Sequence, residues 1–137
     1  MADTSTGTSY APLQQHSVAL AVSNEMVRLY KDLFGRGPTR ARTFFAGPDT
    51  VVCMLETTFT PAEQSLIAMG EHQRLRETRL FFQHAREGDF REAVERITGR
   101  RVHAFISGTD TVADVASEIF QLEPLSAGSS HDPRVMP

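Results

Sequence analysis

The fold of this chain is decided around a short turn with the sequence Gly35-Arg36-Gly37-Pro38-Thr39-Arg40-Ala41-Arg42. Gly35 suits a helix C-terminus, where glycine adopts the left-handed conformation at little cost. Pro38 cannot continue a helix, and aromatic and β-branched residues typical of strands follow it. The stretch therefore predicts a change from helix to strand.

The residues before this turn carry one apolar stripe at helical spacing. Its members are Val22, Met26, Leu29, Tyr30, Leu33 and Phe34. Spacings of three and four residues place them on one face of an α-helix. We expect this helix to end at Gly35.

The residues after the turn predict an antiparallel hairpin. Residues 39–46 and 50–57 have strand composition and flank Gly47-Pro48-Asp49, a turn signal. Because alternate residues of a strand face opposite ways, Arg40, Arg42 and Phe44 are expected to share one face of the first strand.

The second half of the chain predicts further helices and another hairpin. Thr60-Pro61-Ala62-Glu63 is a capping box with proline at the first helical position. Helical spacing continues to about residue 87, with Gly70 either a kink or a true break, and resumes over residues 89–99. Strands are expected over residues 101–107 and 115–122, with Gly108-Thr109-Asp110 in the turn between them.

These elements predict a single α+β domain of order αββααββ, with a four-stranded antiparallel sheet and the helices packed on one face. The folded region is expected over residues 16–123. Residues 1–15 and 124–137 are rich in small and polar side chains, and we expect both to be mobile tails.

Two segments of the chain echo each other. Residues 44–52 and 105–113 share Phe, Gly, Asp, Thr and Val at matching positions, and each follows a Gly-Arg pair at a predicted helix end. One explanation is an αββ duplication with a pseudo-twofold axis. The other is chance, because Gly, Asp and Thr recur in hairpin turns.

Composition is that of a soluble globular protein, with 40% hydrophobic and 23% charged residues. A net charge of -3 gives no general attraction to nucleic acid or anionic lipid. The single cysteine, Cys53, excludes an intrachain disulfide, and the first residues do not read as a signal peptide. No apolar run approaches the roughly 20 residues that span a bilayer, so we expect a cytoplasmic protein.

The glycine-arginine turn is the candidate site for an anion or a protein partner. Arg36, Gly37, Arg40 and Arg42 combine guanidinium groups with accessible backbone N–H groups, which can hold a carboxylate, phosphate or bicarbonate. A purely structural interpretation is also open. In it the glycines make the corner, and the arginines pair with Glu56, Glu118 or a partner chain.

Other chemistry-bearing residues favour structural roles. Arginines and glutamates alternate along the later helices, which is typical of a solvated face with ion pairs. The arginines are Arg74, Arg76, Arg79, Arg86, Arg91, Arg96, Arg100 and Arg101. Cys53 lies mid-strand and is expected to be a buried thiol. The histidines lack metal-ligand spacing, and no nucleophile motif is present, so we expect no metal, no cofactor and no catalysis.

Several motifs occur together in the region that is expected to fold. These are Ser23-Asn24, Phe34-Gly35-Arg36-Gly37-Pro38 with Arg42, Leu55-Glu56, Thr60-Pro61-Ala62-Glu63, Ala93-Val94-Glu95, Thr98-Gly99-Arg100 with Val102, and residues 120–123. In this combination the chain resembles the MpsC family, named after a sodium-translocating membrane potential-generating system. The resemblance covers roughly residues 16–123. It implies a small soluble protein associated with membrane complexes that move cations or inorganic carbon. The signature positions it transfers are Gly35, Gly37, Pro38, Arg42 and Glu63.

The absence of a catalytic motif and this resemblance together predict a non-enzymatic accessory or regulatory protein. The resemblance implies that it is associated, through a protein partner, with a membrane system that transports cations or inorganic carbon. A sheet with helices on one face leaves the other face and its edges to be covered, and a homodimer would do so. Two alternatives stay open. One is a nucleic-acid-binding module of KH-like arrangement, and the other is a small-anion sensor that uses Arg36, Arg40 and Arg42.

Overall fold

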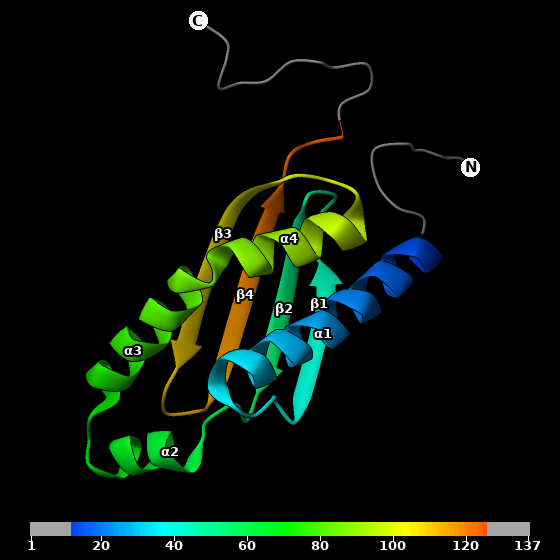
Figure 1. Ribbon diagram of the computed structural model, residues 1–137. Coiled ribbons are helices and arrows are strands. Elements are labelled where there is room, and N and C mark those ends of the chain that lie inside the picture. The colour runs from blue at the N-terminus through cyan, green and yellow to red at the C-terminus, as the bar shows by residue number, and fades with distance from the viewer. Residues whose placement is uncertain (1–11, 126–137) are drawn as a thin grey trace, which may run out of the picture.

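The computed structural model describes residues 12–125, and Figure 1 shows a twisted sheet with the helices on one side of it. The elements are α1 (Pro12–Phe34), β1 (Arg40–Phe45), β2 (Thr50–Glu56), α2 (Pro61–Ala68), α3 (His72–Ala85), α4 (Glu87–Thr98), β3 (Val102–Asp110) and β4 (Val115–Leu122). The predicted single α+β domain with a four-stranded antiparallel sheet is confirmed. The first helical run after the hairpin is divided into α2 and α3.

The strand order in the sheet is β1-β2-β4-β3, with every neighbouring pair antiparallel. The two hairpins therefore meet through their second strands, β2 and β4, and leave β1 and β3 as edges. This is the order that two halves related by a pseudo-twofold axis would give. The two similar segments, residues 44–52 and 105–113, do not occupy equivalent places in the two hairpins, however. Gly47 lies in the β1–β2 turn, whereas Gly108 lies inside β3 opposite Ser117.

The second hairpin turns later than the sequence predicts. Strand β3 continues through Gly108 and Thr109 to Asp110, and the turn occupies residues 111–114. Asp110 fixes this position, because its Oδ1 accepts hydrogen bonds from the backbone N–H groups of Val112 and Ala113, both at 2.9 Å. The expected turn at Gly108-Thr109-Asp110 is therefore wrong.

Two helix starts also differ from expectation, and the question left open at Gly70 is answered. Helix α1 begins at Pro12, so residues 12–15 of the predicted N-terminal tail are helical. Apart from residues 124–125, the rest of both predicted tails lies outside the described residues. Gly70 is a true break, because its φ of 77° and the hydrogen bonds from residues 70 and 71 back to Ile67 and Leu66 end α2. Helix α4 begins at Glu87, two residues before the predicted start at Asp89.

The core lies between the sheet and the helices α1 and α4, which run across it (Figure 1). It contains Val22, Met26, Leu29, Tyr30, Val51, Cys53, Leu55, Phe90, Ala93, Val94, Val102, Ala116, Phe120 and Leu122. The ring of Phe105 stacks between those of Phe90 and Phe120, with centroids 5.4 and 5.1 Å away. Burial alternates along β2 and β4, so each central strand has one face toward the helices and one away from them.

Candidate functional site

The face of the sheet opposite the helices carries none of the described helices (Figure 1). We call it the open face. On β1 it displays Arg40, Arg42 and Phe44, which are exposed, whereas the intervening residues are half-buried. The predicted sharing of one face by these three residues is confirmed.

The open face is organised in rows that cross all four strands. The apolar row consists of Phe44, Val52, Ile119 and Ile106, which lie opposite one another in the strand register. Its two ends are well exposed, Phe44 by 48% and Ile106 by 60%. A continuous apolar row on an exposed sheet face is a candidate contact surface.

Two further rows place charges on the open face. The charged row consists of Arg40, Glu56, Val115 and Asp110, and the middle row of Arg42, Met54, Ser117 and Gly108. Among residues 12–125, the guanidinium groups of Arg40 and Arg42 have no ion-pair partner within 4.0 Å. Glu118 cannot pair with either of them across the face, because it is buried on the helix side.

Arg36 and Gly37 contact other parts of the protein, unlike Arg40 and Arg42, which are exposed on the open face. The Arg36 guanidinium donates hydrogen bonds to the backbone oxygens of Phe59, at 2.9 Å, and Thr57, at 3.2 Å. A Cβ on Gly37 would lie 3.2 Å from Cγ1 of Val27 on α1. The structure therefore gives both residues internal roles at the turn, while Arg40 and Arg42 project from the open face.

The contacts of Arg36 are part of a clamp on residues 57–59, in the connection between β2 and α2. Asp114, in the β3–β4 turn, accepts from all three backbone N–H groups, with its own backbone oxygen for Thr57 and its carboxylate for Thr58 and Phe59. Arg36 binds the first and third carbonyl oxygens, and Arg79 binds that of Thr58 at 3.0 Å. Every backbone polar group of the connection is therefore satisfied within the protein.

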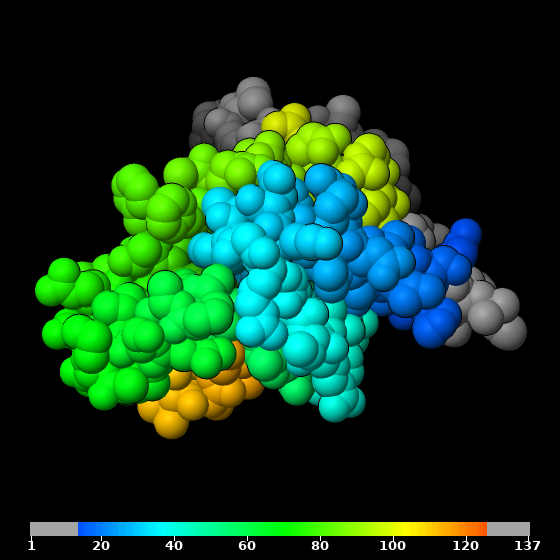
Figure 2. Space-filling model, turned by 60° about the horizontal axis from the view of Figure 1, so that its bottom comes forward, coloured from blue at the N-terminus to red at the C-terminus, as the bar shows by residue number. Residues whose placement is uncertain are grey.

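This clamp joins segments that are far apart in the sequence. Figure 2 views the end of the molecule where they meet, with the turn after α1 in cyan, α2 and α3 in green and the β3–β4 turn in orange. His72 of α3 also contacts that turn, through a 2.8 Å hydrogen bond between its Nδ1 and the Thr111 hydroxyl. The clamped end of the fold is therefore held by side chains from three separate parts of the chain: the turn after α1, α3 and the β3–β4 turn.

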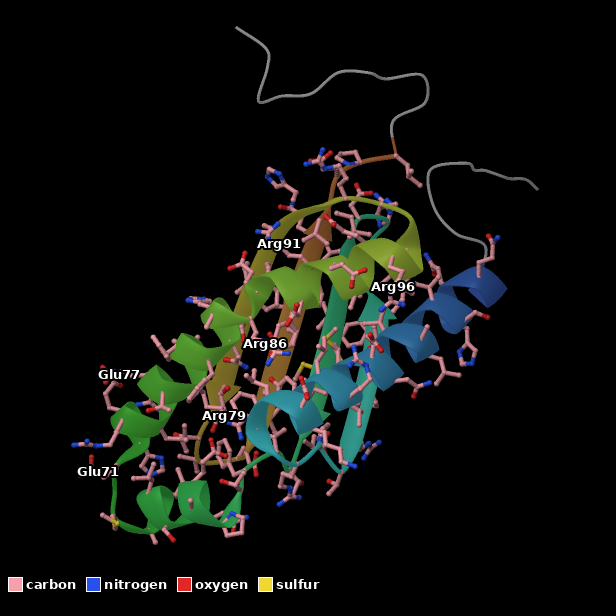
Figure 3. The ribbon with its side chains drawn as sticks, viewed as in Figure 1. Glu71, Glu77, Arg79, Arg86, Arg91 and Arg96 are labelled. Atoms are coloured by element: carbon pink, nitrogen blue, oxygen red, sulfur yellow. The ribbon has the colours of Figure 1, made fainter. Side chains whose placement is uncertain are left out.

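Arg79 contradicts the expected solvated face on the later helices. Its side chain is fully buried, and its Nε and Nη2 donate to the Glu63 carboxylate at 2.7 and 2.6 Å. The guanidinium carbon lies 3.7 Å from the ring centroid of Phe34, a cation–π contact. Figure 3 shows Arg79 on the inner side of α3, whereas Glu71 and Glu77 lie on its outer side.

A signal for this burial was present in the sequence. Arg79 lies four residues after Leu75 and four before Gln83, and all three are buried on the same side of α3. Glu63 is the last residue of the capping box, where its carboxylate also accepts from the Thr60 N–H at 2.9 Å. Burial raises the pKa of Glu63, but the hydrogen bonds from Arg79 and Thr60 outweigh it, so the pKa lies below its ordinary value.

Arg100 is a second buried arginine that the sequence placed on the surface. Its Nη2 donates to Asp49 Oδ1 at 2.5 Å and to the backbone oxygen of Glu123 at 2.8 Å. Its Nη1 binds the backbone oxygen of Pro48 at 2.9 Å. Arg100 thus ties the β1–β2 turn to the end of β4.

Glu118 is the centre of a buried polar cluster between α1, α3 and the sheet. Tyr30 donates to its Oε2 at 2.5 Å, and the Gln83 side-chain amide donates to the same oxygen at 2.9 Å and to the Tyr30 hydroxyl at 3.0 Å. Glu118 Oε1 and Gln83 Oε1 make no hydrogen bond of normal geometry. Burial raises the pKa of Glu118 to about 7, although Tyr30, Ser107, Gln83 and the charge of Arg79 all act to lower it.

Four further arginines of the later helices confirm the predicted surface ion pairs, whereas Arg76 donates instead to the Thr111 hydroxyl at 3.1 Å and to Gln73 Oε1 at 3.2 Å. Arg74 pairs with Glu71, Arg86 with Asp32 and Asp89, Arg91 with Glu87, and Arg96 with Glu25 and Glu92. Arg86, Arg91 and Arg96 follow one another along α3 and α4 in Figure 3. Pairs of this exposure contribute little to stability individually.

Cys53 is buried, as predicted, and burial raises its pKa to about 12. The thiolate form that attacks substrates or binds metal is therefore disfavoured. Within residues 12–125, no group of three or more His, Cys, Asp or Glu side chains could hold a metal ion.

Together these features define a class of protein: a single α+β domain whose buried charges are engaged within the fold and whose sheet presents one open face. The chain belongs to the MpsC family, because the family model described as "Na+-translocating membrane potential-generating system (MpsC)" matches residues 14–124. The predicted resemblance is confirmed over nearly all of the described residues. Comparison with curated proteins and with solved structures finds no match. In the part of the chain that the structure describes, no helix is both long enough and apolar enough to cross a membrane.

Proposed function

We propose that this protein is a non-enzymatic accessory subunit of a membrane system that translocates Na+ and generates a membrane potential. The observation that carries the proposal is the family match, which extends from α1 through the end of β4. It covers the whole α+β fold, so the family role would belong to this domain as a unit.

The placement of the charged side chains supports a role in binding. Arg79, Glu63, Arg100 and Arg36 are engaged with each other or with backbone groups, so they stabilise the fold. The open face, with its apolar row and two arginines free of ion pairs among the described residues, offers a surface for protein contacts. In this proposal the protein is held at the membrane by a protein partner.

Deletion of the gene in its host tests the proposal. Na+-dependent membrane potential would be measured in everted membrane vesicles with a potential-sensitive dye, from the deletion strain and from the same strain carrying the wild-type gene. We expect the deletion to reduce the potential and the wild-type gene to restore it. An unchanged Na+-dependent potential in the deletion strain would exclude the proposed role.

A second candidate function is binding of a small anion by Arg40 and Arg42. They lie two residues apart on one face of β1, which allows both guanidinium groups to approach one anion. Thermal unfolding with millimolar bicarbonate or phosphate tests this, because a ligand that binds only the folded state raises the melting temperature. The rise should disappear in Arg42→Gln, and no rise in the wild type would exclude the candidate.

A further inference from the structure

We propose that the open face binds a second copy of this chain, face to face, about a twofold axis that runs parallel to the strands between β2 and β4. The proposal rests on the sheet register and is independent of any role in Na+ transport. A rotation about this axis places β1 over the partner's β3 and β2 over the partner's β4. Each residue stays in its own row.

The apolar row is complementary to itself under this rotation. Phe44 comes to lie opposite the partner's Ile106, and Val52 opposite the partner's Ile119. The symmetry repeats both contacts, so four apolar pairs form across the interface. Phe44 and Ile106, the most exposed members of the row, gain the most burial.

The charged row is complementary in sign at its two ends, while Glu56 comes to lie opposite the partner's Val115. Arg40 lies at the β1 end of this row and Asp110 at the β3 end, so the rotation places Arg40 opposite the partner's Asp110. Two such pairs form, one on each side of the axis. A twofold axis perpendicular to the strands would instead place each β1 over the partner's β1 and lose this match.

The middle row is complementary in size. Arg42 comes to lie opposite the partner's Gly108, and Met54 opposite the partner's Ser117. Each long side chain therefore meets a small one. Packed sheets cross at about 30°, which displaces the edge residues, and the length of the Arg40 and Arg42 side chains accommodates that displacement.

The area of the face indicates a weak but specific dimer. Four strands of about seven residues present roughly 400 Å² of flat area per copy. The accessible surface buried by two copies is then on the order of 1,000 Å², at the low end of specific interfaces. We expect a reversible dimer with a dissociation constant in the micromolar range.

Sedimentation velocity of the full chain, from micromolar to submillimolar concentration, is the first test. The wild type should pass from monomer to dimer, and Ile106→Arg should remain monomeric because it places a charge opposite the partner's Phe44. The matched control is Val112→Arg in the β3–β4 turn, outside the paired rows of the open face, where an apolar side chain is 84% exposed. A wild type that stays monomeric throughout, or equal behaviour of the two variants, would overturn the proposal.

Engineered cysteines test the direction of the axis. Phe44 and Ile106 lie on opposite edges of one sheet, three strand spacings or roughly 14 Å apart, too far for an intramolecular disulfide. Packed sheets lie about 10 Å apart, which is also beyond the reach of a disulfide, so the thiols are linked with a bismaleimide that spans about 10 Å. The double variant Phe44→Cys/Ile106→Cys should form a covalent dimer with this reagent, and each single variant should not. A covalent dimer from Phe44→Cys alone would show that β1 lies over the partner's β1, which would exclude the proposed axis.

Charge variants test the Arg40 pair in the same sedimentation experiment. Arg40→Glu should weaken the dimer about tenfold, because it faces the partner's Asp110 with a like charge. Adding Asp110→Asn should restore part of this loss, although Asp110→Asn alone should weaken the dimer. Asparagine keeps the oxygen that accepts from Val112 and Ala113, so the turn is preserved. Additive effects of the two changes would contradict the pairing.

Discussion

Arg79 and Glu63 form a bidentate ion pair that joins the middle of α3 to the first turn of α2. The two hydrogen bonds measure 2.7 and 2.6 Å, and the Arg79 side chain is fully buried. Glu63→Gln would leave the buried guanidinium without its counter-charge, which is more costly than removing the whole pair. We expect this variant to lower the free energy of unfolding by about 3 kcal/mol, measured by urea denaturation.

The surface pair of Arg74 and Glu71 provides the control for this prediction. Their side chains are 70% and 42% exposed, so Glu71→Gln should change the free energy of unfolding by less than about 0.5 kcal/mol. The double variant Glu63→Gln/Arg79→Met should lose less stability than the sum of its single variants. Equal losses from Glu63→Gln and Glu71→Gln would show that burial does not strengthen the pair.

The buried carboxyl of Glu118 predicts an unusual pH dependence of stability. Its pKa is raised from 4.5 to about 7, chiefly by burial, so between these values the folded state binds more protons than the unfolded state. Stability from this group is therefore full below about pH 4.5 and falls as pH rises toward 7. The raised pKa corresponds to a loss of roughly 3 kcal/mol across that window.

Comparison with Glu118→Gln isolates this contribution. Glutamine can still accept from Tyr30 and Gln83 but does not titrate. The difference in unfolding free energy, wild type minus variant, should fall by roughly 3 kcal/mol between about pH 5 and about pH 8. Glu63 and Glu25, whose pKa values are lowered, lose their contributions at lower pH in both proteins and cancel. A difference that does not change with pH would show that Glu118 titrates normally.

The elements of this fold were predictable where periodicity and turn chemistry agree. The stripe that ends at Phe34 and the capping box at Thr60 each carry a local signal that the structure confirms. The position of the β3–β4 turn was not predictable from Gly108. Strand β3 continues to pair with β4 as far as Asp110, and the Asp110 side chain then accepts hydrogen bonds from the turn. The preference of glycine for turns is outweighed at Gly108 by the pairing of β3 with β4.

The candidate site was predictable only in part, for a physical reason. Strand alternation places Arg40 and Arg42 on one face whatever the rest of the fold does. The environment of Arg36 depends instead on the carbonyls of Thr57 and Phe59, and the burial of Arg79 depends on the packing of α2 against α3. The spacing of Arg79 with Leu75 and Gln83 indicates a buried side of α3, but contacts between elements that are separate in the sequence leave no such periodic trace.

Gly37 and Gly88 form a matched pair for testing the close approach at the glycine-arginine turn. A Cβ at Gly37 would lie 3.2 Å from Val27 Cγ1 and 3.4 Å from Val27 O, whereas none of the described atoms lies within 4 Å of one at Gly88. Gly37→Ala should lower the free energy of unfolding by about 1 kcal/mol through crowding. Gly88→Ala, in the first turn of α4, should raise it by about 0.5 kcal/mol through helix propensity. Urea denaturation measures both, and changes of the same sign would contradict the close packing of Gly37 on α1.

Asp114 is expected to be the most sensitive residue of the clamp on residues 57–59. Its carboxylate accepts from the N–H groups of Thr58 and Phe59 at 2.8 and 3.1 Å, and its own φ is 55°. Asp114→Ala removes both acceptors and places alanine in the left-handed region, so we expect a loss of about 3 kcal/mol in unfolding free energy.

Asp114→Asn separates the two causes. Asparagine tolerates the left-handed conformation and keeps one acceptor oxygen, so its loss should be about 1 kcal/mol. Hydrogen exchange gives an independent measurement, because both variants should speed exchange at the Thr58 and Phe59 amides while the Asp114→Asn effect stays smaller. If both variants exchange and unfold like the wild type, the carboxylate does not hold the connection, and the clamp depends on Arg36, Arg79 and the backbone oxygen of Asp114.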